Sequence, residues 1–249
     1  ANKTLGYTGR GAFIAAVLEG LPEAPQYFKH NAALNREGPE LAEWKFETLP
    51  LVEPSAELAD PSKFYVVDVR DAEAFASGHI PHSVNVGLRG RFETWMGVMV
   101  PWEANKVVAG DQEQIREALY RLNRIGYTAQ AVLVDGWKQA GLPVTANKRI
   151  SPRELHGQLQ SKDSPLVVDV RLPTEWMALR IGSVINIPLN ELAQRGSTLD
   201  PGDRVVTVCN SAYRSSMALG ILERQGFTRV SSLEGGGEAW VDAGLPVLE

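Results

Sequence analysis

The single cysteine of the chain, Cys209, lies in the stretch VTVCNSAYRSSMALG, residues 206–220. A β-branched run precedes it, Arg214 follows five positions later, and an apolar helical pattern comes directly afterwards. A turn from a strand into a helix leaves several backbone N–H groups without partners, and these groups stabilise an anion. A cysteine in such a loop is favoured as a thiolate, which is the nucleophilic form. The alternative is a small, buried and inert residue, as isolated free cysteines commonly are.

The other residues of this loop are also suited to holding an anion. The guanidinium of Arg214 can bind an anionic substrate through two parallel hydrogen bonds, a geometry that lysine does not reproduce. Small polar side chains let the backbone bend toward a ligand, and Tyr213 is placed to shape access to the loop. The predicted catalytic residues are Cys209 and Arg214, and the predicted substrate-binding residues are Asn210, Ser211, Ala212, Tyr213 and Ser215.

Length and composition limit the class of protein. The 249 residues suffice for two domains of ordinary size, and a net charge of −5 offers no general attraction to nucleic acid or anionic lipid. One cysteine excludes an internal disulfide framework and indicates a reducing compartment. The apolar stretch GAFIAAVLEG, residues 11–20, contains Glu19 and lacks a cleavage pattern, so we expect an amphipathic helix there. We expect a cytoplasmic protein that binds neither nucleic acid nor membrane.

The chain contains two copies of one sequence pattern. Residues 68–88 read DVRDAEAFASGHIPHSVNVGL, and residues 169–189 read DVRLPTEWMALRIGSVINIPL. The two stretches align with each other without gaps. The pentapeptide AGLPV also recurs, at 140–144 and 243–247. A period near 100 residues is too long for a solenoid repeat and indicates two domains, joined near TANKRISP at 145–152.

Each copy alternates strand and helix patterns. In the second copy, Ser151 followed by Pro152 is typical of a helix start, and PLVVDV at 165–170 is typical of a buried parallel strand. The other predicted elements there are helices in PTEWMAL, SSMALGILERQG and GEAWVDAG, and strands in SVINIP, DRVVTVC and RVSSLEG. This alternation predicts an α/β fold, with a mostly parallel central sheet flanked by helices in each copy. Such sheets bind ligands beyond the carboxyl ends of their strands, where Cys209 falls.

At these residues the sequence resembles the rhodanese family of thiosulfate and persulfide sulfurtransferases. CNSAYRS resembles the active-site loop of that family, and DVRLPTEWMALRIGSVINIPL resembles its upstream motif. LEGGGEAWVDAGLPV is similar to its glycine-rich turn and final helix. The resemblance covers both copies, so it implies a tandem of two rhodanese-like domains.

The resemblance also implies a mechanism. Cys209 would take a sulfane sulfur from thiosulfate or a low-molecular-weight persulfide and hold it as a persulfide. A thiol, sulfite or cyanide would then remove the sulfur, in a double displacement that needs no cofactor and no metal. By the same resemblance, Arg214 anchors the donor or steadies the loop. The family often has arginine directly after the cysteine, whereas this chain has Asn210, which leaves the preferred donor open.

The first copy departs from the pattern where the loop should lie. It reads NKVVAGDQEQIREAL, in which the strand runs into Gly110 and Asp111 without a cysteine. This copy cannot form a persulfide, and the Asp111 carboxylate would oppose an anion. We expect it to be structural and to wall one side of the active-site cleft, as in tandem rhodaneses whose first copy is inactive.

Residues 1–49 fit neither copy, so we place the inactive domain at 50–147 and the catalytic domain at 148–249. The N-terminal stretch is similar to the segment that joins a metallo-β-lactamase-like persulfide dioxygenase to rhodanese domains in bacterial fusion proteins. FETWMGVMVP, at 92–101, also resembles the inactive rhodanese of those fusions. The implied partner is a persulfide dioxygenase domain or protein.

Several other residues have expected supporting roles. Asp169 and Arg171 are expected to tie the end of the sheet to the loop by hydrogen bonds. Arg180 faces the cleft or forms a surface salt bridge. Glycines 235–237 would let the last helix approach the loop. The Trp and Met residues of 95–102 are expected in the core or between the domains.

Two other functions remain open. Cysteine phosphatases and arsenate reductases also hold a thiolate in an arginine-closed loop, but their Cys-x5-Arg loop is one residue longer. Four residues separate Cys209 from Arg214 here, which favours the smaller loop that binds sulfur. The third possibility is a non-catalytic scaffold, which the polar, cysteine-bearing loop disfavours.

Overall fold

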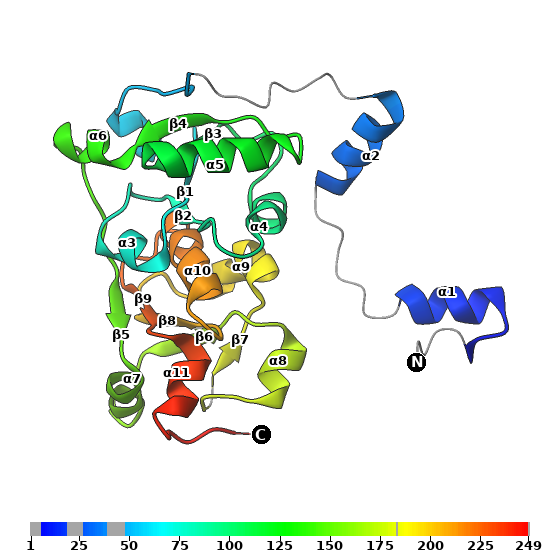
Figure 1. Cartoon of the computed structure of the whole chain (residues 1–249). Helices are drawn as coiled ribbons and strands as arrows, with labels where there is room; N and C mark the ends of the chain where they lie inside the picture. Colours follow the sequence, from blue (N-terminus) through cyan, green and yellow to red (C-terminus); the bar gives the residue numbers. More distant parts are fainter. Residues whose placement is uncertain (1–5, 19–26, 39–47, 183, 249) are drawn as a thin grey trace.

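Two β-branched runs, YVVD and LVVD, form central strands of two separate sheets. The computed structural model describes residues 6–18, 27–38, 48–182 and 184–248. The first sheet has the order β2-β1-β3-β4 and consists of β1 Tyr65–Asp68, β2 Val84–Asn85, β3 Lys106–Gly110 and β4 Gln130–Leu133. The second has the order β5-β9-β8-β6-β7 and consists of β5 Lys148–Ile150, β6 Leu166–Asp169, β7 Ile185–Asn186, β8 Val205–Val208 and β9 Val230–Leu233. Every pairing between these strands is parallel, which confirms the predicted α/β fold (Figure 1).

The two repeats pair their strands in the same register. Asp68 at the end of β1 lies opposite Ala109, and Asp169 at the end of β6 lies opposite Val208. An isolated parallel bridge from Leu51 extends the first sheet beside β4, as β5 extends the second sheet beside β9. The register makes Ala109 and Val208 equivalent, so the residues that follow them can be compared directly.

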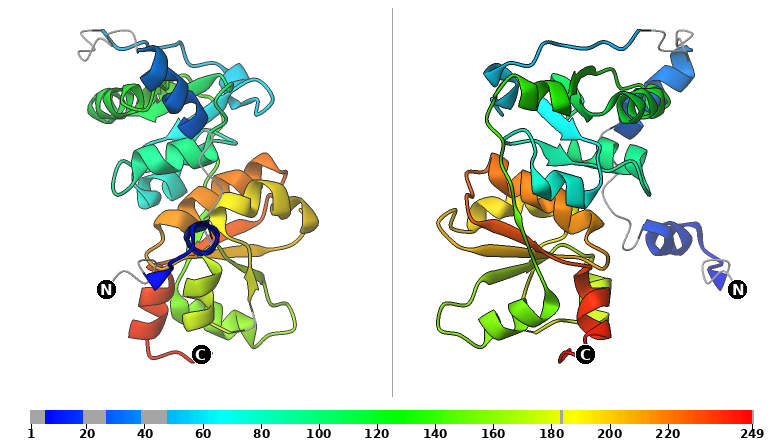
Figure 2. Two further views of the ribbon diagram at one scale, coloured as in Figure 1. Left: turned by 90° about the vertical axis from the view of Figure 1, so that its right-hand side faces the viewer. Right: turned by 60° about the vertical axis from the view of Figure 1, so that its left-hand side comes forward.

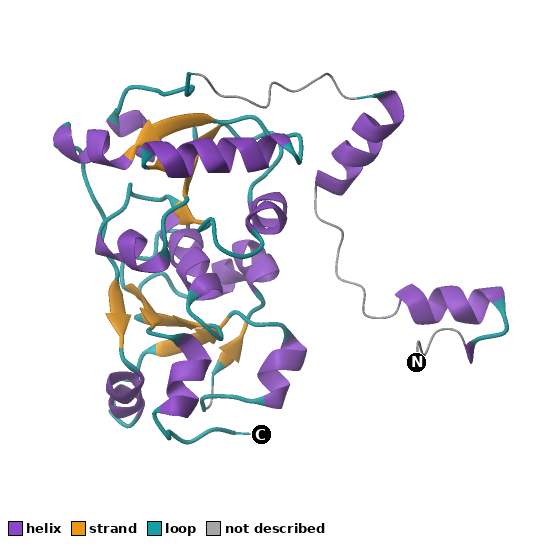
Figure 3. Ribbon diagram, in the orientation of Figure 1, coloured by secondary structure: helices purple, strands orange, loops and turns teal. Residues whose placement is uncertain are grey.

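Helices cover both sheets and fill the layer between them, whereas the first helix of the chain lies apart from the sheets (Figure 3). In the first repeat and the segment before it they are α1 Arg10–Leu18, α2 Tyr27–Glu37, α3 Ala72–Ser77, α4 Phe92–Met99, α5 Gln112–Asn123 and α6 Val134–Gln139. In the second repeat they are α7 Pro152–Leu159, α8 Pro173–Ala178, α9 Leu189–Arg195, α10 Tyr213–Arg224 and α11 Gly236–Asp242. Ser151 caps α7 as predicted, because its Oγ accepts the Glu154 N–H at 3.3 Å. None of the described helices combines the length and apolar character that a membrane span needs.

A single apolar core fills the space between the two sheets. Alternate residues of β1 and β3, such as Val67 and Val108, face this central core, and their neighbours pack on the opposite face of the first sheet. The second repeat contributes Val168 and Cys209 to the same cluster. The thiol therefore points into the layer between the repeats.

Helix α10 occupies this layer, directly after the cysteine loop (Figures 1 and 2). It begins two residues earlier than the predicted helical run, and its residues from Ser215 to Glu223 are all buried. A Cβ on Gly220 would lie 2.2 Å from the Ser83 carbonyl oxygen, so only glycine permits the helix to approach β2 this closely. Ser216 Oγ donates to Asn85 Oδ1 of β2 at 2.7 Å. The helix is thus shared by both repeats.

The C-terminal end of α10 carries a buried polar cluster at the same interface. Glu223 accepts a hydrogen bond from Asn147 Nδ2 at 2.7 Å and lies 3.0 Å from Nε2 of the buried His79. The other ring nitrogen, Nδ1, lies 2.8 Å from the Phe75 carbonyl. Both imidazole nitrogens therefore lie within hydrogen-bond distance of an oxygen, one on the backbone and one on Glu223. Removal of either side chain would leave a buried polar group unpaired.

The N-terminal segment contacts the first repeat through α2. The Tyr27 ring packs directly on Gly97: a Cβ added to this glycine would lie 1.8 Å from the nearest atom of the ring. His30 stacks on Trp102, with 3.9 Å between the ring centroids. Met96 belongs to the central core, as expected for this part of the chain. Residues 92–102 thus support both the core and α2.

Replacement of Glu223 by alanine is expected to lower the free energy of unfolding by about 3 kcal/mol, because it leaves His79 and Asn147 without their buried partner. Urea unfolding followed by circular dichroism measures this change. The matched control is Glu191→Ala, which removes an exposed i,i+4 pair with Arg195 and should cost less than about 1 kcal/mol. Equal losses in the two variants would contradict the interpretation of the interface.

Candidate active site

Cys209 directly follows the last residue of β8, at the carboxyl edge of the second sheet. Ligands of parallel α/β sheets bind at this edge. The cysteine is 1% exposed and its thiol is free. Residues 209–214 turn from β8 into α10 and bring the thiol to the start of that helix. The structure therefore places the thiol where the sequence pattern predicted it.

The loop folds back over the sulfur. The Ser215 N–H donates to Cys209 Sγ at 3.4 Å, and the thiol lies 3.5 Å from Ser215 Oγ, to which it donates. Ser215 Oγ in turn donates to the Ala212 carbonyl at 3.0 Å. Ala212 has a φ of +69°, a left-handed conformation that is uncommon for a residue with a side chain. Such strained backbone is often found at functional sites.

Helix α11 holds the loop from the other side. The Gly237 N–H donates to the Cys209 carbonyl at 2.7 Å, and the Glu238 N–H donates to the Asn210 carbonyl at 3.1 Å. A Cβ on Gly236 would lie 2.3 Å from both of these carbonyl oxygens. The glycine-rich turn therefore lets the last helix approach the loop, as predicted.

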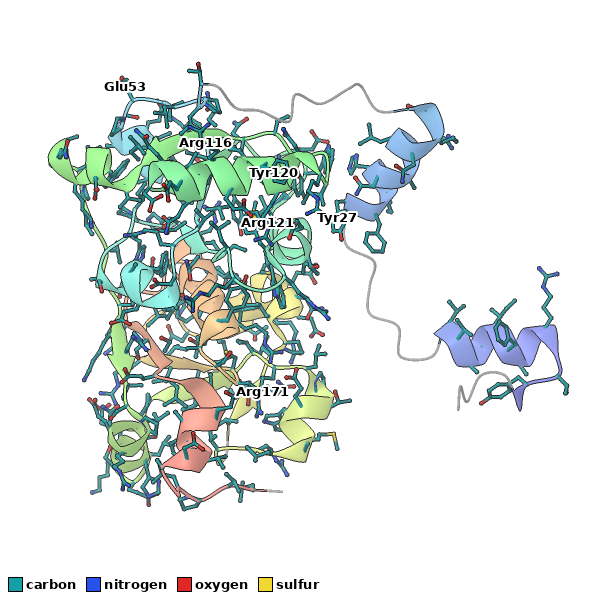
Figure 4. All side chains as sticks on the ribbon, viewed as in Figure 1. Tyr27, Glu53, Arg116, Tyr120, Arg121 and Arg171 are labelled. Atoms are coloured by element: carbon teal, nitrogen blue, oxygen red, sulfur yellow. The ribbon has the colours of Figure 1, made fainter. Side chains whose placement is uncertain are left out.

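Asp169 and Arg171 connect the end of the sheet to the loop. The Arg171 guanidinium donates to both carboxylate oxygens of Asp169, at 2.6–3.0 Å, and to Asn210 Oδ1 at 3.1 Å. Figure 4 shows Arg171 in the second repeat, at this edge of the sheet. The first repeat retains the equivalent Arg70–Asp68 pair. The expected tie between sheet and loop is present.

Arg214 has a partner that the sequence analysis did not identify. Its two terminal nitrogens donate to the two carboxylate oxygens of Glu175 on α8, both at 2.7 Å. Asn210 Nδ2 also donates to Glu175, at 3.3 Å. The two parallel hydrogen bonds expected for an anionic substrate are thus formed within the protein. Glu175 belongs to the motif PTEW, which lies near the loop only in the folded chain. Nothing in the sequence around Arg214 therefore predicts this ion pair.

This ion pair changes the titration of both groups. The hydrogen bonds from Arg214 lower the pKa of Glu175 below its ordinary value of 4.5, against an opposing effect of burial. The same hydrogen bonds raise the pKa of Arg214. Arg214 therefore acts first as a clamp between α8 and the start of α10.

The remaining predicted residues lie in different places. Ser211 is exposed on the loop, and Tyr213 donates from its hydroxyl to the Gly87 carbonyl of the first repeat at 2.8 Å. Burial raises the pKa of Tyr213 to about 12, so it is a neutral donor. Arg180 stacks on the Trp176 ring instead, with its guanidinium carbon 4.8 Å from the ring centroid. Tyr213 therefore joins the site to the first repeat, whereas Arg180 contacts a residue of the second repeat, Trp176.

The first repeat has closed the equivalent loop. Gly110 follows Ala109 and so occupies the position of Cys209. Helix α5 begins two residues later, and Asp111 and Gln114 form a reciprocal capping box. The Asp111 side chain accepts the Gln114 N–H at 2.8 Å, and Gln114 Oε1 accepts the Asp111 N–H at 3.1 Å. These backbone groups already have partners, so no anion site is left at this position.

Within the described ranges, no group of three or more His, Cys, Asp or Glu side chains is arranged to hold a metal ion. The polar neighbours of the Cys209 sulfur are the N–H and hydroxyl of Ser215, and the Arg214–Glu175 clamp holds the same loop. This arrangement suits a thiol nucleophile that acts on a small anionic or polarisable group.

Replacement of Glu175 by glutamine is expected to lower Tm by about 2–4 °C at pH 7, because a partly exposed bidentate pair contributes about 1 kcal/mol. Since the pKa of Glu175 is lowered in the folded chain, the contribution is complete above pH 4.5 and is lost as the pH falls through the folded pKa. The Tm difference from the parent should therefore be constant between pH 7 and 5 and shrink at lower pH. Glu53→Gln, a change at an exposed residue far from Arg171 in Figure 4, is the control. A difference that does not depend on pH would contradict the assigned ion pair.

Replacement of Gly236 by alanine is expected to destabilise the chain by at least about 2 kcal/mol more than Gly244→Ala, because of the contact with the loop carbonyls. The two glycines have φ values of +65° and +66°, but a Cβ on Gly244 would have nothing within 4 Å. The control therefore measures the backbone cost alone. Urea unfolding measures both variants, and equal losses would show that α11 does not constrain the loop.

Comparison with known proteins places this geometry in a family. The model of the rhodanese-like domain matches residues 53–140 and 151–243. A Synechocystis protein of unassigned function, slr1261, is 36% identical over 103 residues, which are 41% of this chain and 57% of that protein. A sulfurtransferase of Allochromatium vinosum is 33% identical over 99 residues, 40% of this chain and 92% of that protein. A solved rhodanese-related protein of Thermoplasma volcanium is 29% identical, covers 41% of this chain and 97% of its own, and has a TM-score of 0.38. With both repeats matched, the chain belongs to the rhodanese family, as a tandem of two rhodanese-like domains.

Proposed function

We propose that this protein is a sulfurtransferase that carries a sulfane sulfur on Cys209. The observation that carries the proposal is the position of the only thiol, at the end of β8 and under the loop whose Ser215 N–H points at its sulfur. The named sulfurtransferase among the relatives supports the same activity. The catalytic thiol belongs to the second repeat.

The proposed reaction is a double displacement. The Cys209 thiolate attacks the outer sulfur of thiosulfate, the sulfur–sulfur bond of the donor breaks, and sulfite leaves with the electron pair of that bond. With a persulfide donor, the leaving group is the donor's thiolate. An acceptor nucleophile then attacks the outer sulfur of the Cys209 persulfide and releases the Cys209 thiolate. No net oxidation or reduction of the protein occurs, so the cycle needs no redox cofactor.

The surrounding residues have positioning roles in this scheme. The backbone N–H groups of the loop would stabilise the charge of the persulfide, as they would any anion at the start of a helix. The Arg214–Glu175 clamp and the Arg171–Asp169 pair hold the loop in shape. Replacement of Arg214 by lysine keeps the charge but loses the two parallel hydrogen bonds, and should weaken donor use.

The phosphatase alternative fits the site less well. A thiolate phosphatase needs an arginine that is free to bind a tetrahedral oxyanion, whereas the Arg214 fork is occupied by Glu175. Turnover of an aryl phosphate faster than of thiosulfate would favour that alternative. The proposed physiological setting, beside a persulfide dioxygenase, is supported by the resemblance of residues 1–49 to the linkers of such fusions.

The intact mass of the protein after incubation with thiosulfate or a low-molecular-weight persulfide tests the proposal. We expect a gain of about 32 Da, one sulfur atom, that cyanide removes. Cys209→Ser should abolish the gain while the circular dichroism spectrum is retained. A serine variant with full sulfur transfer, or a parent chain that gains no sulfur from either donor, would overturn the proposed function.

A further inference from the structure

A cavity of about 690 Å³ lies between the cysteine loop and the inactive first repeat. Its lining includes Ser211 and Tyr213, two and four residues after Cys209, so the cavity borders the loop. The first repeat contributes the carboxyl ends of β1 and β2 and the starts of α3 and α5, with Val69, Asp71, Arg89 and Gln114 among the residues. Its volume is within the range of small-molecule sites.

The wall of this cavity is built from fixed groups. The Tyr213 hydroxyl holds the Gly87 carbonyl, and Arg121 donates to the Leu88 carbonyl at 2.6 Å. Arg121 is itself held by two hydrogen bonds to Glu93, and Figure 4 shows it beside α4. Gly90, with a φ of +79°, completes the turn. The segment that leads to Arg89 is therefore anchored at two successive carbonyls.

The cavity lining contains one positive and one negative side chain, Arg89 and Asp71. Arg89 is exposed, and none of the described residues forms a salt bridge with it. Asp71 caps α3 through Oδ1, which accepts the N–H groups of Glu73 and Ala74 at 3.0 and 2.8 Å. Its Oδ2 has no hydrogen-bond donor among the described residues. An exposed guanidinium and a free carboxylate oxygen thus line one cavity whose floor, at Val69, is apolar.

We propose that this cavity binds the sulfur acceptor, and that the acceptor is a thiol of the amino-acid type, with both an ammonium and a carboxylate group. The inference rests on the proposed function of Cys209. Arg89 would bind the carboxylate and Asp71 Oδ2 the ammonium. A simple anion gains at Arg89 and loses at Asp71, so a zwitterion fits the paired charges best.

The transfer step balances without another reactant. The acceptor thiolate attacks the outer sulfur of the Cys209 persulfide and forms a new sulfur–sulfur bond. The bond between that sulfur and Cys209 breaks, and its electron pair stays on the Cys209 thiolate. The products are the acceptor persulfide and the free enzyme. In this scheme the first repeat selects the acceptor although it has no nucleophile of its own.

Four small thiols separate the contributions of the two charges. The rate constant for discharge of the Cys209 persulfide is measured with L-cysteine, 3-mercaptopropionate, cysteamine and 2-mercaptoethanol, and each rate is corrected for the thiolate fraction and divided by that for 2-mercaptoethanol. Arg89→Gln should lower the ratios for cysteine and mercaptopropionate about 3- to 10-fold and spare that for cysteamine. Asp71→Asn, which keeps a helix-capping residue, should lower the ratios for cysteine and cysteamine and spare that for mercaptopropionate.

Two exposed residues outside the lining provide matched controls. Arg91→Gln removes a positive charge two residues from Arg89, and Glu113→Gln removes a negative charge next to Gln114. Both controls should keep the parent's ratios. Ratios that are unchanged in Arg89→Gln and Asp71→Asn, while the persulfide still forms and cyanide removes it, would overturn the assignment of the cavity and leave the proposed function standing.

Binding of S-methyl-L-cysteine, which cannot accept sulfur, tests the cavity without any persulfide. Calorimetry or ligand-observed NMR should show saturable binding to the parent that is weakened about 3- to 10-fold in Arg89→Gln and in Asp71→Asn. Absence of saturable binding to the parent would overturn the inference whatever the sulfur-transfer activity. If binding is present but Cys209 gains no sulfur from any donor, the proposed function fails and the amino-acid site stands.

Discussion

The burial of helix α10 on all of its faces is the constraint on which the rest of the structure depends. The helix starts at the cysteine loop and fills the layer between two sheets, so nine consecutive residues, Ser215 to Glu223, are buried. Each large apolar side chain among them stabilises this position by about 1.5–3 kcal/mol. Gly220 permits the closest approach, where the helix lies against the backbone of β2. The loop cannot shift unless the central core opens, which is why one end of the loop is rigid.

Two buried polar side chains of the same helix, Ser216 and Glu223, find their partners in the first repeat. Ser216 donates to Asn85, and Glu223 lies between Asn147 and the imidazole of His79. Asn85 also donates to the Asp68 and Arg70 carbonyls, so it serves its own repeat and the interface together. A buried polar group without a partner lowers the stability of the fold by more than an ordinary hydrogen bond raises it. The two repeats are therefore matched by chemistry as well as by shape.

The repeats keep the same framework and differ at the loop. Arg70 pairs with Asp68 as Arg171 pairs with Asp169, and both arginines also donate to a backbone carbonyl eight residues later. After β3, however, the chain enters α5 through Asp111 alone, and the capping box at Asp111 uses the backbone groups that the longer loop at Cys209 leaves free. The cavity beside this closed connection is lined by both repeats, and the hydrogen bond from Tyr213 to the Gly87 carbonyl joins them there.

The sequence by itself determined the class of fold, the duplication and the position of the thiol. β-branched runs, helix caps and a repeated DVR motif are local signals, and the elements they predict are present, with shorter strands such as Ile185–Asn186. Tertiary structure alone decided what Arg214 binds, since Glu175 is 39 residues away in the chain and meets it only through the packing of α8. It also decided that Ala212 is left-handed, that Arg180 stacks on Trp176, and that Asp71 and Arg89 line one cavity with the loop. Such facts depend on contacts between distant segments, and no periodicity or spacing along the chain records them.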